Sequence, residues 1–224
     1  MASSARPPDA PLETETRLSP TGRVEAFSDG VMAIAITLLV LDLRVPLATD
    51  IVPGDLTTRL LERWPSYVAY LTAFLTIGII WLNHRTLVES IARFDGRLHW
   101  LNLMLLLGVV TLPWPTALVA EYVQRGGPDL SAAAVLYGLT ATLMATPWGF
   151  IWRHLADHPE LLEAGYDAAY ARASLRNGFL GLPIYALATL VAVFLPVVAL
   201  ILYLAIAILY ATRSQGIAVP AARA

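Results

Sequence analysis

Six apolar stretches follow one another along the chain, each close to the roughly 20 residues that cross a bilayer as a helix. They lie at about 23–43, 64–88, 98–122, 131–153, 175–194 and 196–213. The last two form one apolar run from Gly178 to Tyr210. As a single helix this run would be about 50 Å long, well beyond a hydrocarbon core of about 30 Å. Pro196 is expected to divide it, because proline cannot continue the helical hydrogen bonding.

Composition agrees with a membrane protein. Of the 224 residues, 57% are hydrophobic and only 14% are charged, too few charges to cover a soluble domain of this size. We therefore predict an all-α integral membrane protein with six transmembrane helices per subunit and the lipid bilayer as its environment. Residues 1–22 are polar and rich in proline, so we expect a disordered tail there. The six-helix domain should occupy 23–213, and 214–224 a C-terminal tail.

The distribution of arginine predicts the orientation, because cytoplasmic segments carry an excess of positive charge. With the N-terminus inside, the outer segments carry only Arg44, Arg59, Arg63 and Arg125. The inner segments carry Arg6, Arg17, Arg23, Arg85, Arg93, Arg97, Arg153, Arg172, Arg176, Arg213 and Arg223. Both termini are therefore expected in the cytoplasm, which an even number of spans allows.

Several kinds of chemistry find no support in the sequence. The chain has no cysteine, and its net charge of −2 gives no reason to expect a nucleic-acid partner. We find no Ser-His-Asp, H-E-x-x-H or paired-carboxylate pattern, so we expect no enzyme activity, cofactor or resident metal. His154 and His158 are spaced one helical turn apart, and we interpret them as a solvated helix end rather than a metal site.

Polar side chains gather at one level of the first three spans. An intramembrane carboxylate such as Asp29 is costly and normally has a partner. Because spans 1, 2 and 3 alternate in direction, their polar residues meet on the cytoplasmic side. These residues are Arg23, Ser28, Asp29, Asn83, His84, Arg85 and Asn102. They could form a hydrogen-bonded clamp between the helices, or a proton or cation site in which Asp29 and His84 titrate.

A second feature of the first span is an apolar stripe. Ile34, Thr37, Leu38 and Leu41 fall at i, i+3, i+4 and i+7, one face of a helix. In an isolated helix this pattern is ordinary packing. If several copies surrounded an axis, the same stripe would line a narrow apolar pore with a single ring of hydroxyls. The pattern alone does not decide between the two.

Three motifs resemble one family. R-V-E-A-F-S-D-G at 23–30, W-L-N-H-R at 81–85, and L-N-L at 101–103 followed by L-P at 112–113 are similar to bacterial members of the transmembrane protein 175 (TMEM175) family of lysosomal potassium channels. The resemblance covers spans 1 to 3 by motif and spans 4 to 6 by hydropathy only. It implies a homotetramer in which helix 1 of each subunit lines a central cation pore.

The resemblance also implies roles for particular residues. The apolar constriction of the family corresponds to Ile34, Leu38 and Leu41, and the family's selectivity-linked threonine corresponds to Thr37. Its helix-packing network corresponds to Phe27, Ser28, Asp29 and His84, to which the polar layer adds Arg23, Asn83, Arg85 and Asn102.

The leading functional interpretation is a potassium-permeable cation channel of the plasma membrane that conducts K⁺ passively. The chain has no T-V-G-Y-G filter sequence. The alternative is a proton-coupled secondary transporter that uses Asp29 and His84 as its relay.

Overall fold

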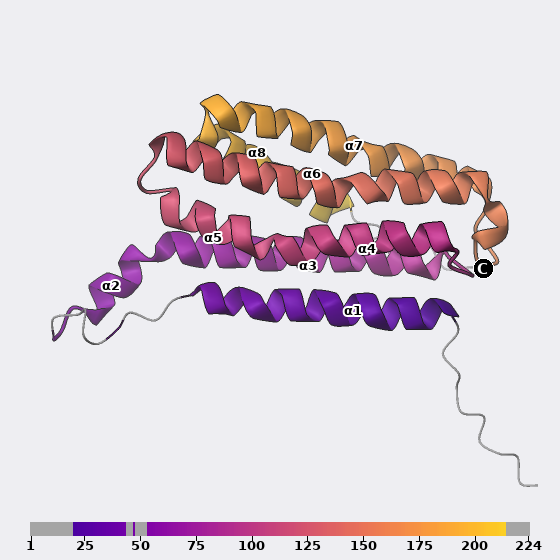
Figure 1. The fold of residues 1–224 in the computed structure, drawn as a ribbon, viewed down its shortest axis with the longest axis horizontal. Coiled ribbons are helices and arrows are strands. Elements are labelled where there is room, and N and C mark those ends of the chain that lie inside the picture. Colours follow the sequence, from indigo (N-terminus) through magenta and orange to yellow (C-terminus); the bar gives the residue numbers. More distant parts are fainter. Residues whose placement is uncertain (1–19, 44–46, 48–52, 214–224) are drawn as a thin grey trace, which may run out of the picture.

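A computed structural model describes residues 20–43, 47 and 53–213. Its elements are helices, which are labelled in chain order in Figure 1. The bounds are α1 Pro20–Leu38, η1 Leu39–Asp42, α2 Leu56–Glu62, α3 Trp64–Glu89, α4 Gly96–Thr111, α5 Pro113–Tyr122, α6 Gly127–Asp157, η3 Pro159–Leu161, α7 Ala168–Phe194 and α8 Pro196–Arg213.

Five helices are long and apolar enough to cross a membrane: Thr21–Leu41, Trp64–Glu89, Gly96–Tyr122, Gly127–Asp157 and Ala168–Phe194. The sixth predicted span is the shorter apolar helix Pro196–Tyr210. The described chain therefore has an all-helical membrane fold with five candidate spans and one shorter apolar helix. The predicted C-terminal tail, and the predicted N-terminal tail up to residue 19, lie outside the described residues. Residues 20–22, which we placed in the tail, begin α1 instead.

Prolines set three of the boundaries. Pro20 opens α1, where its fixed φ suits a first helical turn. The third predicted span is divided between α4 and α5 at Pro113, and the last apolar run between α7 and α8 at Pro196, where the sequence predicts a break. By contrast, Pro147 and Pro183 lie inside α6 and α7 without ending either helix.

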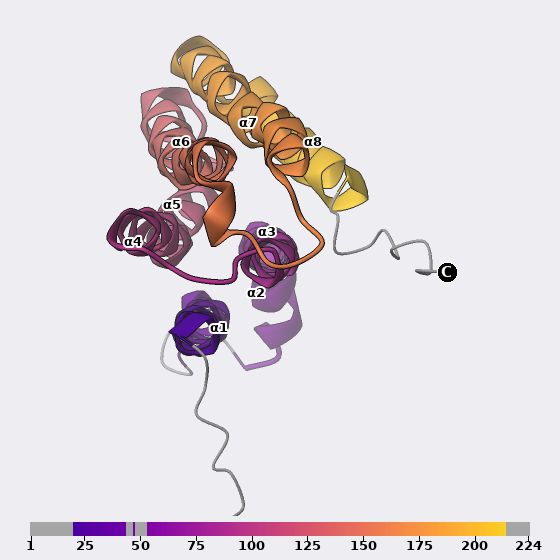
Figure 2. The same ribbon diagram turned by 90° about the vertical axis from the view of Figure 1, so that its right-hand side faces the viewer.

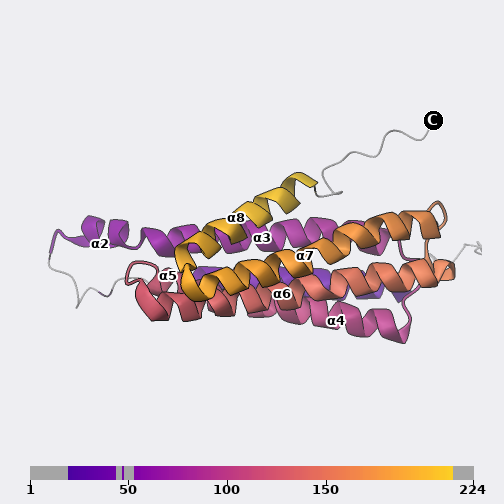
Figure 3. The same ribbon diagram turned by 90° about the horizontal axis from the view of Figure 1, so that it is seen from above.

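The helices form layers, with α1 at one margin of the bundle (Figure 1). Helix α1 packs on α3 and α4. Helix α3 in turn packs on α5, and α4 on α6, while the most extensive contact is between α6 and α7. Viewed end-on, α1 lies against one side only of the α3–α4 layer (Figure 2). Helix α8 begins beside the end of α7 and diverges from it along its length (Figure 3).

At the end of the bundle where α1 begins, which we call the amino-terminal end, two loops pair as extended backbone. Ile91 and Leu162 form an isolated antiparallel bridge. The N–H of Ala92 donates to the carbonyl of Leu161 at 2.9 Å, and that of Glu163 to the carbonyl of Ser90 at 2.9 Å. The hydroxyl of Thr21 donates to the carbonyl of Ala92 at 2.8 Å, which ties the start of α1 to the same loops.

Candidate functional site

Helix α1 has one face buried within the subunit. Ser28, Met32, Ala35 and Leu39 are each at most 3% exposed, and their spacing of four, three and four residues places them on one stripe. This stripe packs against α3 and α4. The rotation of α1 about its own axis is therefore set by contacts inside the subunit.

A buried hydrogen-bond chain joins the three helices at the polar end of that stripe. Asn102 on α4 donates through Nδ2 to the Ser28 hydroxyl at 3.0 Å. Its Oδ1 lies 2.8 Å from Nε2 of His84 on α3. Because the amide oxygen can only accept, His84 must donate through Nε2–H, which fixes the tautomer of the neutral ring. We call Ser28, Asn102 and His84 the clamp.

The other ring nitrogen of His84 is in a different situation. Nδ1 is buried and has no hydrogen-bond partner among the described residues. The side chain itself is 1% exposed. Because an unpaired buried charge is far more costly than an unpaired buried lone pair, the neutral imidazole fits this environment. His84 therefore acts here as a hydrogen-bond donor that holds α3 against α4.

Asp29 makes a separate contact. Its Oδ1 accepts a hydrogen bond from Trp81 Nε1 on α3 at 2.8 Å. Trp81 was not among the sequence-predicted residues, although it lies one helical turn before His84 and so on the same side of α3. The acid next to the clamp is thus held by an indole, which links α1 directly to α3.

The other residues of the predicted network lie elsewhere. Asn83 donates to the carbonyl of Ile79 on its own helix at 2.9 Å. Arg85 pairs with Glu89 one turn further along α3 at 3.0 Å. Arg23 is exposed, and Phe27 is 53% exposed. The structure thus brings together Ser28, Asp29, His84 and Asn102. The other four predicted residues, Arg23, Phe27, Asn83 and Arg85, lie on other faces.

The predicted apolar stripe lies on the uncovered side of α1. Ile34 is 60% exposed, Leu38 51% and Leu41 71%. Thr37 is exposed as well, and its hydroxyl donates to the carbonyl of Ile34 at 2.9 Å. The α-helical hydrogen bonding ends at Leu38, so Leu41 extends the stripe through the tighter η1 turn.

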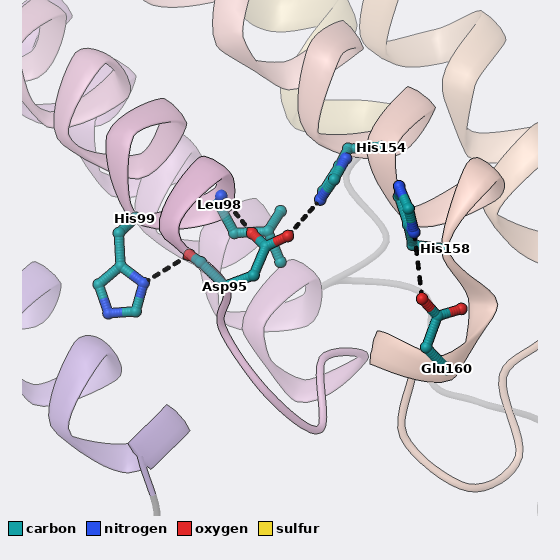
Figure 4. Close-up of polar contacts among 6 residues, drawn as sticks. All are labelled: Asp95, Leu98, His99, His154, His158 and Glu160. Atoms are coloured by element: carbon teal, nitrogen blue, oxygen red, sulfur yellow. Dashed lines mark hydrogen bonds and ion pairs between the residues drawn. The ribbon is translucent and has the colours of Figure 1, made fainter.

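A second polar cluster occupies the amino-terminal end of the bundle (Figure 4). Asp95 caps α4 by accepting the Leu98 N–H at 2.8 Å, and its other oxygen lies 2.6 Å from Nε2 of His154 on α6. Partial burial raises the pKa of Asp95, but the hydrogen bonds from Leu98 and His154 outweigh it, so the pKa lies below the ordinary value of 3.8. This contact ties α4 to α6.

The two histidines of α6 differ in environment. His158 follows the end of α6, is half exposed and lies 3.1 Å from Glu160, in keeping with a solvated helix end. His154 is 6% exposed and faces Asp95, so the interpretation of both as solvated was wrong for His154. Within the described ranges, no group of three or more acidic or histidine side chains is arranged to hold a metal ion.

Comparison with known proteins agrees with this geometry. The sequence profile of the endosomal/lysosomal potassium channel TMEM175 family matches residues 23–113, which contain Ser28, His84 and Asn102. A protein of Streptomyces collinus named as a potassium channel is 46% identical over 170 residues, covering 75% of this chain and 81% of that protein. The chain belongs to the TMEM175 family. The family predicted from the motifs is thereby confirmed.

Two further matches of this TMEM175 family member come from Chamaesiphon minutus. A potassium channel of that organism is 41% identical over 159 residues, covering 71% of this chain and 75% of the relative. The crystal structure of a Chamaesiphon minutus homologue of the lysosomal potassium-selective channel TMEM175 superposes with a TM-score of 0.76 at 36% identity. It covers 87% of this chain and 98% of that one. The fold is therefore that of a TMEM175 channel, and the protein is a multi-pass membrane channel rather than an enzyme.

Proposed function

We propose that four copies of this chain form a potassium-permeable cation channel whose central pore is lined by α1. The observation that carries the proposal is the two-sidedness of α1. One stripe, from Ser28 to Leu39, is fixed to α3 and α4, while the stripe through Ile34, Leu38 and Leu41 is left uncovered by the subunit. A helix held in this way by its own subunit can present the other side to an axis shared with copies of itself.

Small residues support such an assembly. Gly30 and Ala33 are exposed on α1, and a Cβ built on Gly30 meets nothing within 4 Å in the subunit. Small residues are enriched where membrane helices approach closely, because backbones can then come into contact. The uncovered face of α1 thus combines large apolar side chains with positions that allow neighbouring helices to approach.

The proposed pore would be narrow and largely apolar. Rings of Ile34, Leu38 and Leu41 would form the constriction, which can gate by excluding water. The Thr37 hydroxyl, between Ile34 and Leu38, would be the polar group that a passing K⁺ meets there, and we assign it to selectivity. The chain carries no T-V-G-Y-G sequence, so a carbonyl filter of that type does not enter the proposal.

The remaining features of the proposal concern placement. We place the channel in the plasma membrane with both termini in the cytoplasm, because the arginine distribution favours that orientation. The amino-terminal end of the bundle is then its cytoplasmic end, and α8 serves as the sixth helix of the domain at 23–213. K⁺ is the permeant ion, and no cofactor or nucleic acid enters the proposal.

A proton-coupled transporter would need Asp29 and His84 to exchange a proton. In the structure Asp29 bonds to Trp81 and His84 to Asn102, and no hydrogen bond joins the two within the described part of the chain. Asp29→Asn keeps an oxygen acceptor for Trp81 but cannot ionise. Retained folding and unchanged currents across a pH series in this variant would support a structural Asp29, whereas loss of coupled proton flux would support the relay.

The central experiment measures currents from the full chain reconstituted in planar bilayers. Ile34→Asn should raise unitary conductance by wetting the constriction. Ile201→Asn is the matched control, because Ile201 lies on α8 and is 62% exposed, close to the 60% of Ile34. An unchanged conductance in Ile34→Asn, or an equal increase in Ile201→Asn, would contradict a pore lined by α1.

A further inference from the structure

A cavity of about 190 Å³ lies among α3, α6, α7 and α8, on a different face of α3 from the clamp. It occurs where α8 diverges from α7 (Figure 3), so that α3, α7 and α8 do not close on one another. Side chains from Thr76 to Leu87 on α3 line it, a distance of about 16 Å along the helix. The cavity is thus elongated and lies within the spanning part of the bundle.

The lining contains no charged side chain among the residues that the structure describes. Most of it is apolar, including Ile80, Met144 and Ile184. Exposed side chains such as Leu180 and Leu209 also border it, which places its opening on the surface of the bundle. A molecule dissolved in the bilayer can therefore reach the cavity from the side.

Neutral polar groups are also present in the lining. Asn83 uses its Nδ2 on the Ile79 carbonyl, which leaves its Oδ1 as an acceptor beside the cavity. Asn177 contributes an exposed carboxamide from α7. Deeper in, the buried Thr76 hydroxyl lies close to the Tyr137 hydroxyl. Asn83 and Asn177 thus offer neutral carboxamides to a ligand in the cavity.

We propose that this cavity binds a single-chain amphiphile with an uncharged, hydroxyl-bearing head group, such as a monoacylglycerol. The head group is assigned as neutral because a charge would find no counter-charge in the lining and would lose hydration. Its hydroxyls suit the carboxamides of Asn83 and Asn177. The tail follows the apolar walls.

The size of the cavity restricts the tail to one chain. An apolar cavity of about 150 Å³ in another protein accepts a single benzene molecule, so about 190 Å³ holds part of one acyl chain and not two. The rest of the chain lies against the exposed rim at Leu180 and Leu209. The proposal concerns binding alone and does not depend on conduction, so it stands or falls separately from the proposed pore.

The test is native mass spectrometry of the purified full chain in detergent with monoolein as the probe. The comparison ligands are oleate, which is charged, and dioleoylphosphatidylcholine, which has two chains. Ala207→Phe fills the cavity, and Ala205→Phe makes the same change on an exposed part of α8 outside the lining. We expect bound monoolein on the wild type and on Ala205→Phe, and loss of most of it on Ala207→Phe.

Two further results decide the chemistry. Asn83→Leu should weaken monoolein binding but not that of octadecene, which lacks the hydroxyls. If Ala207→Phe does not fold, Ile184→Trp fills the same cavity, and Leu187→Trp is its exposed control on α7. Equal monoolein binding by filled and control variants would overturn the site. Preferential, filling-sensitive binding of oleate or of the phosphatidylcholine would overturn the proposed head group or the single chain.

Discussion

Ser28 on α1 and Asn102 on α4 are joined by a buried hydrogen bond of 3.0 Å although 74 positions separate them in the sequence. The same Asn102 side chain accepts from His84, so one carboxamide holds two other helices. Polar contacts between membrane helices contribute about 0.6 kcal/mol on average, and the cost rises when a partner is left buried and unpaired.

Asn102→Leu should therefore lower the free energy of unfolding by about 1–3 kcal/mol. Ser28→Ala should lower it by less. The Asn102→Leu variant leaves both the Ser28 hydroxyl and His84 Nε2–H without their partner, whereas Ser28→Ala leaves only one amide hydrogen unpaired. Thermal unfolding in detergent, followed by circular dichroism, measures the difference. Thr111→Val is the control, because its hydroxyl bonds only within α4, to the Leu107 carbonyl. An equal loss of thermal stability in Asn102→Leu and Thr111→Val would show that the clamp does not stabilise the protein.

Thr37→Val should lower the preference for K⁺ over Na⁺ while leaving current intact, if α1 lines the pore as proposed. Valine keeps the shape of threonine and removes the hydroxyl. We expect the permeability ratio to fall toward unity, seen as a shift of the reversal potential with K⁺ on one side and Na⁺ on the other. Thr37→Ser keeps the hydroxyl and should retain the wild-type value. A reversal potential that valine does not change would place selectivity elsewhere in the channel.

Asp95→Ala should destabilise the protein at pH 7 by about 1 kcal/mol, because α4 loses its N-cap and His154 loses its partner. The pKa of Asp95 is lowered in the folded protein, so its ionised form stabilises the fold above the ordinary value of 3.8. This contribution is lost as the pH falls through the lowered pKa. The difference in melting temperature between variant and wild type should therefore shrink in acid.

The control for this prediction is Asp129→Ala, which removes an exposed acid from the first turn of α6. Its effect should be smaller at pH 7. Asp95→Asn adds a second comparison, because asparagine also caps helices well but carries no charge. A loss in Asp95→Ala that stays constant from pH 7 down to the acid range would show that the carboxylate form has no special role.

Gly108→Ala should loosen the contact between α4 and α6. A Cβ at Gly108 would lie 2.7 Å from the Cα of Met144, so backbone would have to move, and overpacking of this kind costs about 1–3 kcal/mol. Gly78→Ala on α3 is the matched control, since a Cβ there meets nothing within 4 Å and alanine favours the helix by about 1 kcal/mol. The melting temperature should fall in the first variant and hold or rise in the second. A fall of equal size in both would contradict close packing at Gly108.

The sequence predicted what depends on position along a helix. Pro113 and Pro196 mark helix boundaries because of their own backbone chemistry. The meeting of Ser28, His84 and Asn102 follows from alternating helix directions and a rise of 1.5 Å per residue. The level of a residue along the bundle can thus be worked out from the chain before any contact is known.

The sequence did not predict what depends on the rotation of each helix. Asn83 and His84 are neighbours, yet 100° of rotation sends one toward the lateral cavity and the other into the clamp. Trp81, by contrast, lies one helical turn before His84, so the spacing along α3 could have indicated it as a partner of Asp29. The contact between Asp95 and His154 joins residues 59 positions apart through the fold of two loops, and no local pattern marks it.

Helix α8 has a consequence for the surrounding lipid. Its apolar part, Pro196–Tyr210, is about 22 Å long, whereas a typical hydrocarbon core is about 30 Å thick. Hydrophobic mismatch of this sign is relieved by local thinning of the bilayer. If α8 spans the bilayer as the proposed sixth helix, the rim of the subunit at α8 should favour a thinner membrane than α6 and α7 do, so the thickness of the host bilayer becomes a variable in any reconstitution of this channel.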